Sequence, residues 1–197
     1  MVRLLSIILF LALFVTVYGQ SEEELFAEEL VTAALRLTEQ DVVYDPAYYA
    51  IDYPNGDVPT DRGVCTDVVI RAYRYLGIDL QKEVHDDMEA NFNLYPDIWG
   101  LSGPDSNIDH RRVPNLMKYF ERHGIEKSIS NHGGDYLPGD IVCWNLGGAI
   151  THIGIIAKTR SRDGSRPMLV HNIGSGQVLE DCLFDYRIIG HYIYQGK

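Results

Sequence analysis

The chain has 197 residues, of which 46% are hydrophobic, and it carries a formal net charge of −11. A chain of this length is expected to form one domain with a sizeable core. The acidic excess argues against nucleic acid and against an anionic membrane surface as partners, because both are bound through Lys and Arg.

The N-terminal segment has the pattern of a secretory signal peptide. A single Arg3 precedes a nearly continuous apolar run over residues 4–17, and small residues follow at a point suited to signal peptidase. We therefore expect residues 1–20 to be removed and residues 21–197 to form one exported domain, periplasmic or secreted, without stable membrane insertion. The apolar run is shorter than the roughly 20 residues of a spanning helix, but an uncleaved N-terminal anchor remains the alternative.

Four segments carry the start signals or the apolar periodicity of helices. The first begins with a capping box at Ser21, and the fourth is expected to begin with Asp109 as its cap. The acidic segment 85–87 and the basic cluster 110–112 are both expected to face solvent, the latter as a loop or helix start. The predicted helices span residues 21–39, 65–76, 80–91 and 109–122, with Gly77 and Gly124 as the stops of the second and fourth.

From residue 137 onward the periodicity changes to that of strands. A hairpin turn is predicted over residues 159–165, between the second and third of them. Helices first and antiparallel strands last is an α+β order. The predicted strands span residues 140–145, 151–158, 168–173 and 187–194.

Cys65 is the first candidate for a catalytic residue. Val69, Ala72 and Leu76 follow it at spacings of four, seven and eleven residues, so the thiol is expected on the buried face of its helix. Cys65 also lies in the first turn, where unpaired N–H groups and the helix dipole favour a negative charge. This position predicts a lowered thiol pKa and a nucleophilic thiolate. The alternative is a buried structural cysteine.

Two histidines on neighbouring predicted strands supply a candidate base and a group to orient it. His152 stands early in one strand and His171 near the end of the next, so the hairpin sets them side by side. Gly154 shares a face with His152, which predicts a close approach of the helix there. Whether His171 or Asn172 orients the base stays open. The alternative for each histidine is a half-buried strand residue with a satisfied hydrogen bond.

Cys143 and Cys182 are the two other cysteines after the signal segment. They either pair in a disulfide, which leaves Cys65 as the free thiol, or both stay reduced. The seven histidines lack the spacing of zinc ligands, so the sequence predicts no metal site.

These residues lie in segments that resemble the NlpC-type cysteine peptidases, the papain-like group of bacterial cell-wall hydrolases. Across most of the chain after the signal peptide, the resemblance is closer to an uncharacterised bacterial branch, the domain of unknown function 1287 family, in residues 59–67 and 109–116. The segments similar to the NlpC-type motifs are Gly63-Val64-Cys65-Thr66-Asp67-Val68-Val69, Leu137-Pro138-Gly139-Asp140-Ile141-Val142, His152-Ile153-Gly154-Ile155 and Val170-His171-Asn172.

The resemblance implies a papain-like α+β fold, with N-terminal helices, including the nucleophile helix, packed on a C-terminal antiparallel sheet. It also implies roles: Cys65 as nucleophile, His152 as general base and His171 as the group that orients it. The backbone N–H of Cys65 would contribute to an oxyanion hole, and Asp140 would be structural. The family usually has Asp-Cys-Ser-Gly at the nucleophile where this chain has residues 64–67, so substrate identity does not carry over. The candidates for substrate binding or the oxyanion hole are Asp61, Arg62, Asn172, Tyr53 and Trp99.

We therefore expect an exported cysteine hydrolase that cleaves amide bonds in a peptide or peptidoglycan-like substrate without a cofactor. One alternative keeps the fold but acts as a thiol acyltransferase, or as an amidase on a small molecule or lipid. The other is a catalytically inactive envelope protein that binds a ligand with the loop around Tyr95 and Trp99.

Overall fold

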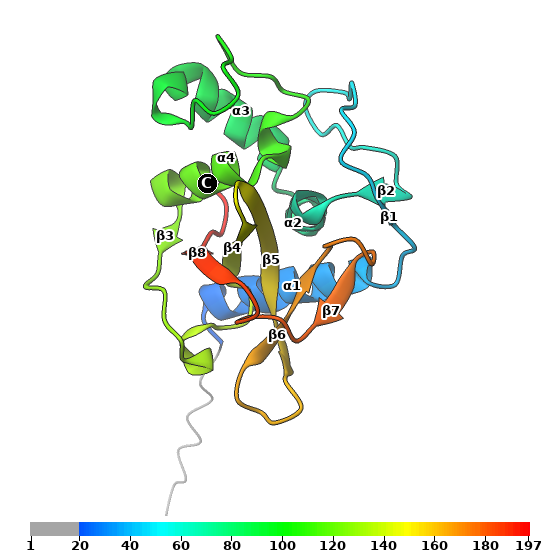
Figure 1. Cartoon of the computed structure of the whole chain (residues 1–197), viewed down its shortest axis with the longest axis vertical. Helices are drawn as coiled ribbons and strands as arrows, with labels where there is room; N and C mark the ends of the chain where they lie inside the picture. The colour runs from blue at the N-terminus through cyan, green and yellow to red at the C-terminus, as the bar shows by residue number, and fades with distance from the viewer. Residues whose placement is uncertain (1–19) are drawn as a thin grey trace, which may run out of the picture.

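The computed structural model describes residues 20–197, so the predicted signal peptide falls almost wholly outside the described residues. Within this range the chain forms four α-helices and a six-stranded antiparallel sheet, which confirms the predicted α+β class (Figure 1). No helix between residues 20 and 197 is both long and apolar enough to cross a membrane.

The helices begin where side chains satisfy their first free N–H groups. The Ser21 hydroxyl accepts from the Glu24 N–H at 3.1 Å, and the Glu24 carboxylate accepts from the Ser21 N–H at 3.0 Å, which is the predicted capping box. After the second helix, Gly77 adopts a φ of 81°, the left-handed stop expected there. The helices are α1 (Glu22–Leu37), α2 (Cys65–Tyr75), α3 (Leu80–Asn91) and α4 (Val113–His123), with 3-10 turns at Phe92–Leu94, Asp109–Arg111 and Gly133–Asp135.

The start of α4 differs from the prediction. Asp109 does not cap the helix but lies in the preceding 3-10 turn, where its carboxylate accepts hydrogen bonds from the Asp105 N–H and from Arg112. The helix begins at Val113 with Pro114 in its first turn, a position that tolerates the missing N–H of proline.

The sheet contains the four predicted strands and two short edge strands that the pattern did not reveal. Its order is β3-β8-β4-β5-β6-β7, with antiparallel neighbours throughout. A separate parallel pair, β1 with β2, joins the Tyr-rich segment to the residues just before Cys65. The strands are β1 (Val43–Tyr44), β2 (Arg62–Gly63), β3 (Ile125–Glu126), β4 (Ile141–Gly147), β5 (Ile150–Arg160), β6 (Pro167–His171), β7 (Val178–Glu180) and β8 (Arg187–Ile193).

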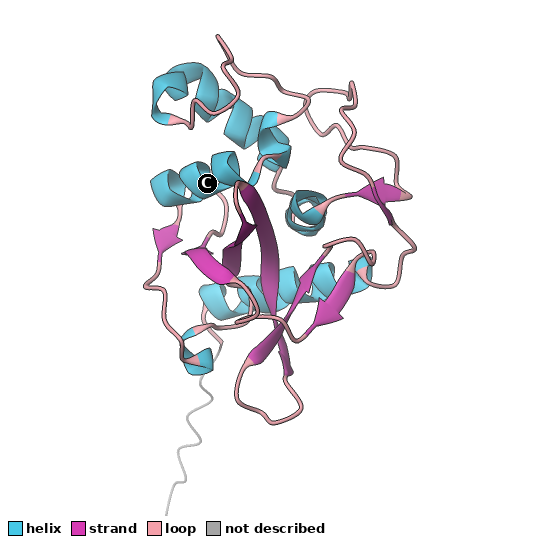
Figure 2. Ribbon diagram, in the orientation of Figure 1, coloured by secondary structure: helices cyan, strands magenta, loops and turns pink. Residues whose placement is uncertain are grey.

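The two faces of the sheet bury different side chains. Figure 2 shows α1 crossing one face, with α2 seen end-on beside β5. On this face the helices pack on what we call the helix-side core, which includes the sheet residues Cys143, Ile153 and Ile155. On the other face, loops cover the loop-side core, which comprises Tyr136, Val142, Trp144, Ile156, Leu169, Cys182 and Leu183.

One segment of α3 is less exposed than predicted. Asp87 is buried, and its carboxylate contacts Arg122 at 2.8 Å, the Tyr95 hydroxyl at 2.6 Å and His123 at 2.9 Å. The expectation of a solvent face over residues 85–87 is therefore wrong for Asp87, because it ties α3 to α4 and to the loop that follows α3.

Candidate active site

Cys65 is the first residue of α2, and its side chain is buried in the helix-side core, as its spacing predicted. Burial raises the pKa of the thiol to about 12. The Ile153 N–H, which faces the sulfur, opposes this rise, while Asp67 adds to it. The lowered pKa expected from the helix N-terminus is therefore wrong, because desolvation outweighs the helix dipole. The thiol is protonated at neutral pH.

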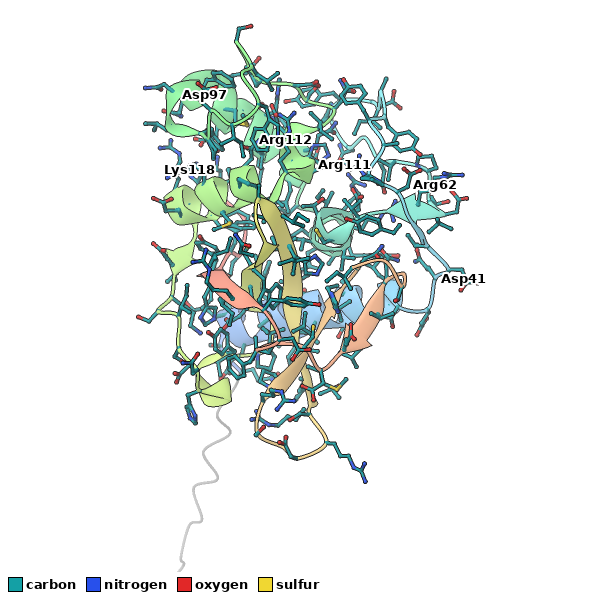
Figure 3. The ribbon with its side chains drawn as sticks, in the orientation of Figure 1. Asp41, Arg62, Asp97, Arg111, Arg112 and Lys118 are labelled. Carbon is teal, nitrogen blue, oxygen red and sulfur yellow. The ribbon has the colours of Figure 1, made fainter. Side chains whose placement is uncertain are left out.

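A buried ion pair fixes the start of α2. The Asp67 carboxylate accepts from the Val64 N–H at 2.7 Å and from two guanidinium nitrogens of Arg111 at 2.9 and 3.0 Å. The Thr66 hydroxyl donates to the Arg111 carbonyl at 3.1 Å, so the two segments meet twice. Arg111 and the neighbouring His110 are buried, so the prediction that cluster 110–112 faces solvent is wrong. In Figure 3, Arg111 lies close to α2, whereas Arg62 lies farther out by β2.

The two predicted catalytic histidines are in direct contact. His152 Nε2 lies 2.8 Å from His171 Nδ1, and the rings meet edge to face at 81°. Both rings lie on the loop-side face of the sheet, where His152 also packs on Trp144. Of the two residues that the sequence offered as partners of His152, His171 is the one in hydrogen-bond contact with it, whereas Asn172 contacts Gly63 and Gly174.

Glu180 extends this contact into a chain of three side chains. Its carboxylate oxygen lies 2.9 Å from His171 Nε2. An ionised carboxylate only accepts, so His171 must carry its proton on Nε2 and accept at Nδ1. His152 must then donate from Nε2, which leaves the lone pair of its Nδ1 free. Glu180 therefore sets the tautomer of both rings in the form that a general base requires.

Both histidines are neutral at physiological pH. Burial, followed by the proximity of His171, lowers the pKa of His152 to about 3. Burial also lowers the pKa of His171, although Glu180 partly opposes this effect. The resting site therefore pairs a neutral thiol with a neutral imidazole.

The thiol and the base lie on either side of one stretch of β5. The pairing of β5 with β6 begins at Ile155, so the Ile153 N–H lies past the end of β6 and is free to face the Cys65 sulfur. His152, one residue earlier, points to the opposite face. Among the described residues no hydrogen bond joins the thiol to the imidazole. Because the pairing with β6 does not reach Ile153, no neighbouring strand separates the two groups on that side of β5, unlike Cys143 and Cys182. A rotation of the Cys65 side chain or of the His152 ring is the movement that would bring them together.

Gly154 has a different role from the one predicted. A Cβ there would lie 2.9 Å from Leu169 Cδ1 and 3.2 Å from His171 Cβ. Both neighbours belong to β6, on the loop-side face and away from α2. The prediction that a helix approaches at Gly154 is therefore wrong: the missing side chain makes room for His171 beside His152.

Asn172 supports the nucleophile segment. It is buried, and its amide donates to the Gly63 carbonyl at 3.3 Å, two residues before Cys65. Its Oδ1 accepts from the Gly174 N–H at 3.1 Å, which fixes the loop after β6.

The other predicted site residues do not contact the histidines. Arg62 pairs with Asp45 at 2.8 Å, and Asp61 is largely exposed beside it. The Tyr53 hydroxyl donates to Asp86 on α3 at 2.8 Å. Trp99 lies under the guanidinium of Arg112 at 4.2 Å. Of the five candidates for substrate binding, Asn172 is the one whose side chain donates a hydrogen bond to the backbone just before Cys65, at Gly63.

Two residues near the site were missed from the sequence. Tyr44 pairs with Gly63 across β1 and β2. Burial raises the Tyr44 pKa, and the Cys65 thiol raises it further, so Tyr44 lies close to Cys65. Glu180 is the second, and it lies in a strand of only three residues. Neither strand is long enough to give a period that can be read in advance.

The three cysteines are all free. Cys143 belongs to the helix-side core and Cys182 to the loop-side core. The sheet lies between them, so the disulfide considered from the sequence does not form. Cys182 instead lies 3.5 Å from His171 Nε2.

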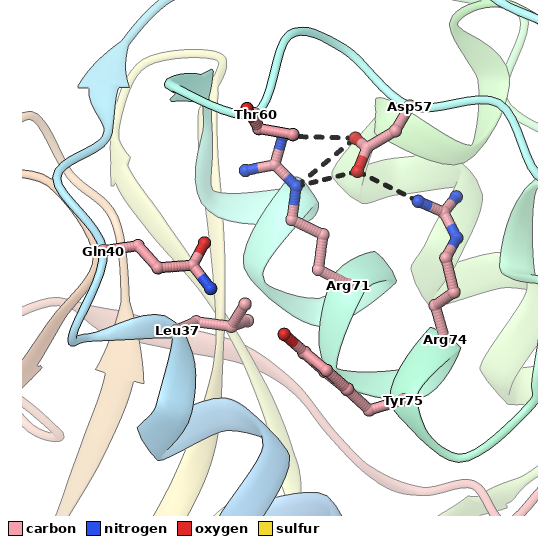
Figure 4. A pocket seen from close by; sticks show the side chains of 7 residues that line it. All are labelled: Leu37, Gln40, Asp57, Thr60, Arg71, Arg74 and Tyr75. Carbon is pink, nitrogen blue, oxygen red and sulfur yellow. Dashed lines mark hydrogen bonds and ion pairs between the residues drawn. The ribbon is translucent and has the colours of Figure 1, made fainter.

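A pocket of about 280 Å³ opens beside α2, but none of the predicted site residues lines it. Asp57 lies between Arg71 and Arg74 at its rim, with both contacts at 3.0 Å (Figure 4). Arg71 also donates to the Arg62 carbonyl at 2.9 Å. These contacts hold the segment that leads into Cys65 against the flank of α2.

The described chain is thus an α+β domain whose candidate site is formed by the start of α2 and the loop-side face of β5, β6 and β7. A family model described as "Domain of unknown function (DUF1287)" matches residues 31–194. The chain belongs to this family, which confirms the closer of the two resemblances. It is also similar to a protein of Escherichia coli (strain K12) described as "Uncharacterized protein YijF", at 54% identity over 151 residues, covering 77% of this chain and 73% of the relative.

Proposed function

We propose that this protein is a papain-like, NlpC-type cysteine hydrolase that is exported and cleaves amide bonds in the stem peptides of peptidoglycan. The observation that supports it best is the chain of contacts from His152 to His171 to Glu180, at 2.8 and 2.9 Å. These contacts leave His152 Nδ1 unprotonated. His152 directly precedes Ile153, whose N–H faces the Cys65 sulfur. The choice of substrate rests on the resemblance to cell-wall hydrolases and on the predicted export.

In the proposed reaction, Cys65 Sγ attacks the amide carbonyl and His152 Nδ1 takes the thiol proton. The sulfur–carbon bond forms as the carbonyl becomes an oxyanion, which the Cys65 N–H at the start of α2 helps to stabilise. The protonated His152 then gives its proton to the leaving nitrogen, and the carbon–nitrogen bond breaks. Water, deprotonated by His152, hydrolyses the thioester and regenerates the thiol.

His171 and Glu180 are positioning residues in this scheme. When His152 becomes an imidazolium, its Nε2–H donates to His171 Nδ1, and the negative charge of Glu180 lies at the end of the same chain. The carboxylate therefore favours the charged intermediate, as the third residue of a catalytic triad does. Because the resting thiol is neutral, proton transfer accompanies attack on the substrate and no preformed ion pair is required.

The test uses residues 21–197 and purified peptidoglycan, with new amino groups and released fragments as the readouts. Activity is expected from the wild type and is expected to be lost in Cys65→Ala and in His152→Gln. Cys143→Ala is the matched control, because it removes a buried thiol from the same core without touching the histidines. Activity that persists in Cys65→Ala would refute the nucleophile.

Product analysis separates hydrolysis from transfer. A free amine and a free acid support a hydrolase, whereas a new ester or amide formed with an added acceptor would replace it with a thiol acyltransferase. Binding of peptidoglycan fragments without any turnover, unchanged in Cys65→Ala, would replace it with an envelope binding protein.

A further inference from the structure

A second group of side chains meets at His171, on the side away from His152. His171 Nε2 lies 2.9 Å from a Glu180 carboxylate oxygen and 3.5 Å from Cys182 Sγ. The three candidate ligand atoms all lie within 4.8 Å of one another. His171 and Cys182 are buried, whereas the Glu180 side chain is 51% exposed. The group is thus walled in by protein on one side and open to solvent on the other.

The spacing of these atoms matches a tetrahedral zinc site. Zn–N bonds of about 2.0 Å and Zn–S bonds of about 2.3 Å place a histidine nitrogen and a cysteine sulfur roughly 3.5 Å apart. The observed 3.5 Å between His171 Nε2 and Cys182 Sγ needs no adjustment. Glu180 lies slightly closer to His171 than a shared metal would hold it, and its exposed carboxylate is free to move outward.

The charge around the thiol favours a cation. Three acidic side chains lie close enough to Cys182 to raise its pKa further beyond the effect of burial: Glu180, Asp185 and Asp181. Arg166 neutralises Asp181 through two contacts at 2.7 and 2.9 Å, but Asp185 forms no ion pair within residues 20–197. The negative charge that keeps this thiol protonated also attracts a cation, which takes the place of the thiol proton when it binds.

We propose that His171 Nε2, the Glu180 carboxylate and Cys182 Sγ bind one borderline divalent transition metal ion, with Zn²⁺ as the best fit. One nitrogen, one sulfur and one oxygen ligand suit zinc and not magnesium or calcium, which prefer oxygen ligands alone. Water would supply a fourth ligand, because the Glu180 side chain is exposed to solvent. Binding forms three metal–ligand bonds and releases two protons to solvent, one from the Cys182 thiol and one from His171 Nε2. His152 passes its Nε2 proton to His171 Nδ1 and takes one proton back from solvent at Nδ1.

The inference has a consequence for the reaction, and this consequence rests on the proposed function. A metal on His171 Nε2 takes the place of the proton there, so His171 carries its proton on Nδ1 and donates to His152 Nε2. His152 then carries its own proton on Nδ1, the nitrogen that has to accept from Cys65. The bound metal therefore switches off the base by reversing both tautomers, and its removal restores them.

Binding is tested first, without reference to activity. Co²⁺ is titrated into the Cys65→Ala form of residues 21–197, because this variant keeps the site and lacks the proposed nucleophile. A thiolate-to-cobalt charge-transfer absorption that saturates at one equivalent and is displaced by Zn²⁺ is expected. It should disappear when Cys182→Ser is added and persist when Cys143→Ala is added, while Glu180→Gln should weaken binding by about tenfold or more. No absorption, or an absorption that survives Cys182→Ser, would overturn the inference.

The effect on activity is tested second, with each variant compared with its own metal-free rate. Stoichiometric Zn²⁺ is expected to inhibit peptidoglycan cleavage by the Cys143→Ala form and to leave the Cys182→Ser form uninhibited. Cobalt binding without any hydrolase activity would support the metal site and refute the proposed function. Hydrolysis that Zn²⁺ does not slow, in a protein that binds cobalt through Cys182, would refute the tautomer switch.

Discussion

Replacement of Arg111 by methionine tests how far the buried ion pair stabilises the start of α2, where Cys65 lies. The Arg111 and Asp67 side chains are 2% and 3% exposed, and two hydrogen bonds join them. Methionine keeps much of the volume but leaves Asp67 as a buried, unpaired carboxylate. Loss of one partner of such a pair costs about 3–5 kcal/mol, which is a large share of the roughly 5–15 kcal/mol that stabilises a domain.

Arg62→Met is the matched control. Arg62 also pairs with an aspartate, Asp45, at 2.8 Å, but its side chain is 46% exposed. Exposed pairs contribute about 0–1 kcal/mol. Arg111→Met and Arg62→Met both remove a guanidinium group. They differ mainly in the burial of the aspartate that loses its partner, Asp67 or Asp45.

A double variant separates the orphaned charge from the lost packing. Asp67→Asn keeps an oxygen that can cap the Val64 N–H, and combined with Arg111→Met it leaves no buried charge. We expect the double variant to be more stable than the sum of the two single effects predicts, by about 2 kcal/mol or more.

Urea unfolding followed by tryptophan fluorescence measures the stability of all four variants: Arg111→Met, Arg62→Met, Asp67→Asn and the double variant. An Arg111→Met protein as stable as Arg62→Met, or single effects that add within about 0.5 kcal/mol, would refute the reasoning. Either result would mean that the Asp67 carboxylate becomes hydrated or protonated without a loss of folding free energy.

Three further predictions concern the sheet and its histidines. Gly154→Ala places a Cβ 2.9 Å from Leu169 Cδ1 and 3.2 Å from His171 Cβ. It should therefore lower the free energy of unfolding in urea by about 1–3 kcal/mol and reduce peptidoglycan cleavage. A variant with wild-type stability and wild-type cleavage would contradict the close packing. Burial, then Arg111, lowers the pKa of His110 to about 3. The unfolded chain therefore binds the extra proton, and stability should fall as pH drops from about 6.5 towards 3, by up to about 1.4 kcal/mol per unit for this residue; His110→Gln should flatten that slope, and an identical slope would show that His110 is already protonated in the fold. Iodoacetamide should label Cys65 slowly at pH 7 and about tenfold faster for each unit of pH above that, because its thiol pKa is raised to about 12. Rapid labelling at pH 6 to 7 would indicate a preformed thiolate.

Long, strongly patterned elements could be predicted from the sequence, because each carries its own signal. The capping box at Ser21 and the apolar spacing after Cys65 gave two helices close to their observed bounds. Alternation along β5 and β6, with a polar turn between them, was enough to bring His152 and His171 together. These signals are local, and the structure preserves them.

Features that depend on distant partners could not be predicted. The burial of Arg111 follows from its ion pair with Asp67, more than forty residues away, and no local pattern distinguishes the cluster 110–112 from a solvated basic loop. The raised thiol pKa of Cys65 follows from complete burial, which a helix position alone does not reveal. Tyr44 and Glu180 were missed because their strands have two and three residues.

The candidate site joins segments that are far apart along the described chain. Its proposed nucleophile stands at residue 65, whereas the base, its partner and the terminal carboxylate span residues 152–180. The fold is closed by equally distant contacts, such as the Tyr73 hydroxyl donating to the Tyr194 carbonyl at 2.8 Å. A chain emerging from the ribosome therefore displays its thiol long before it possesses a base, and the sheet that carries the base is completed only with β8. Because such non-local closure is slow, the thiol and the two histidines come together late in folding.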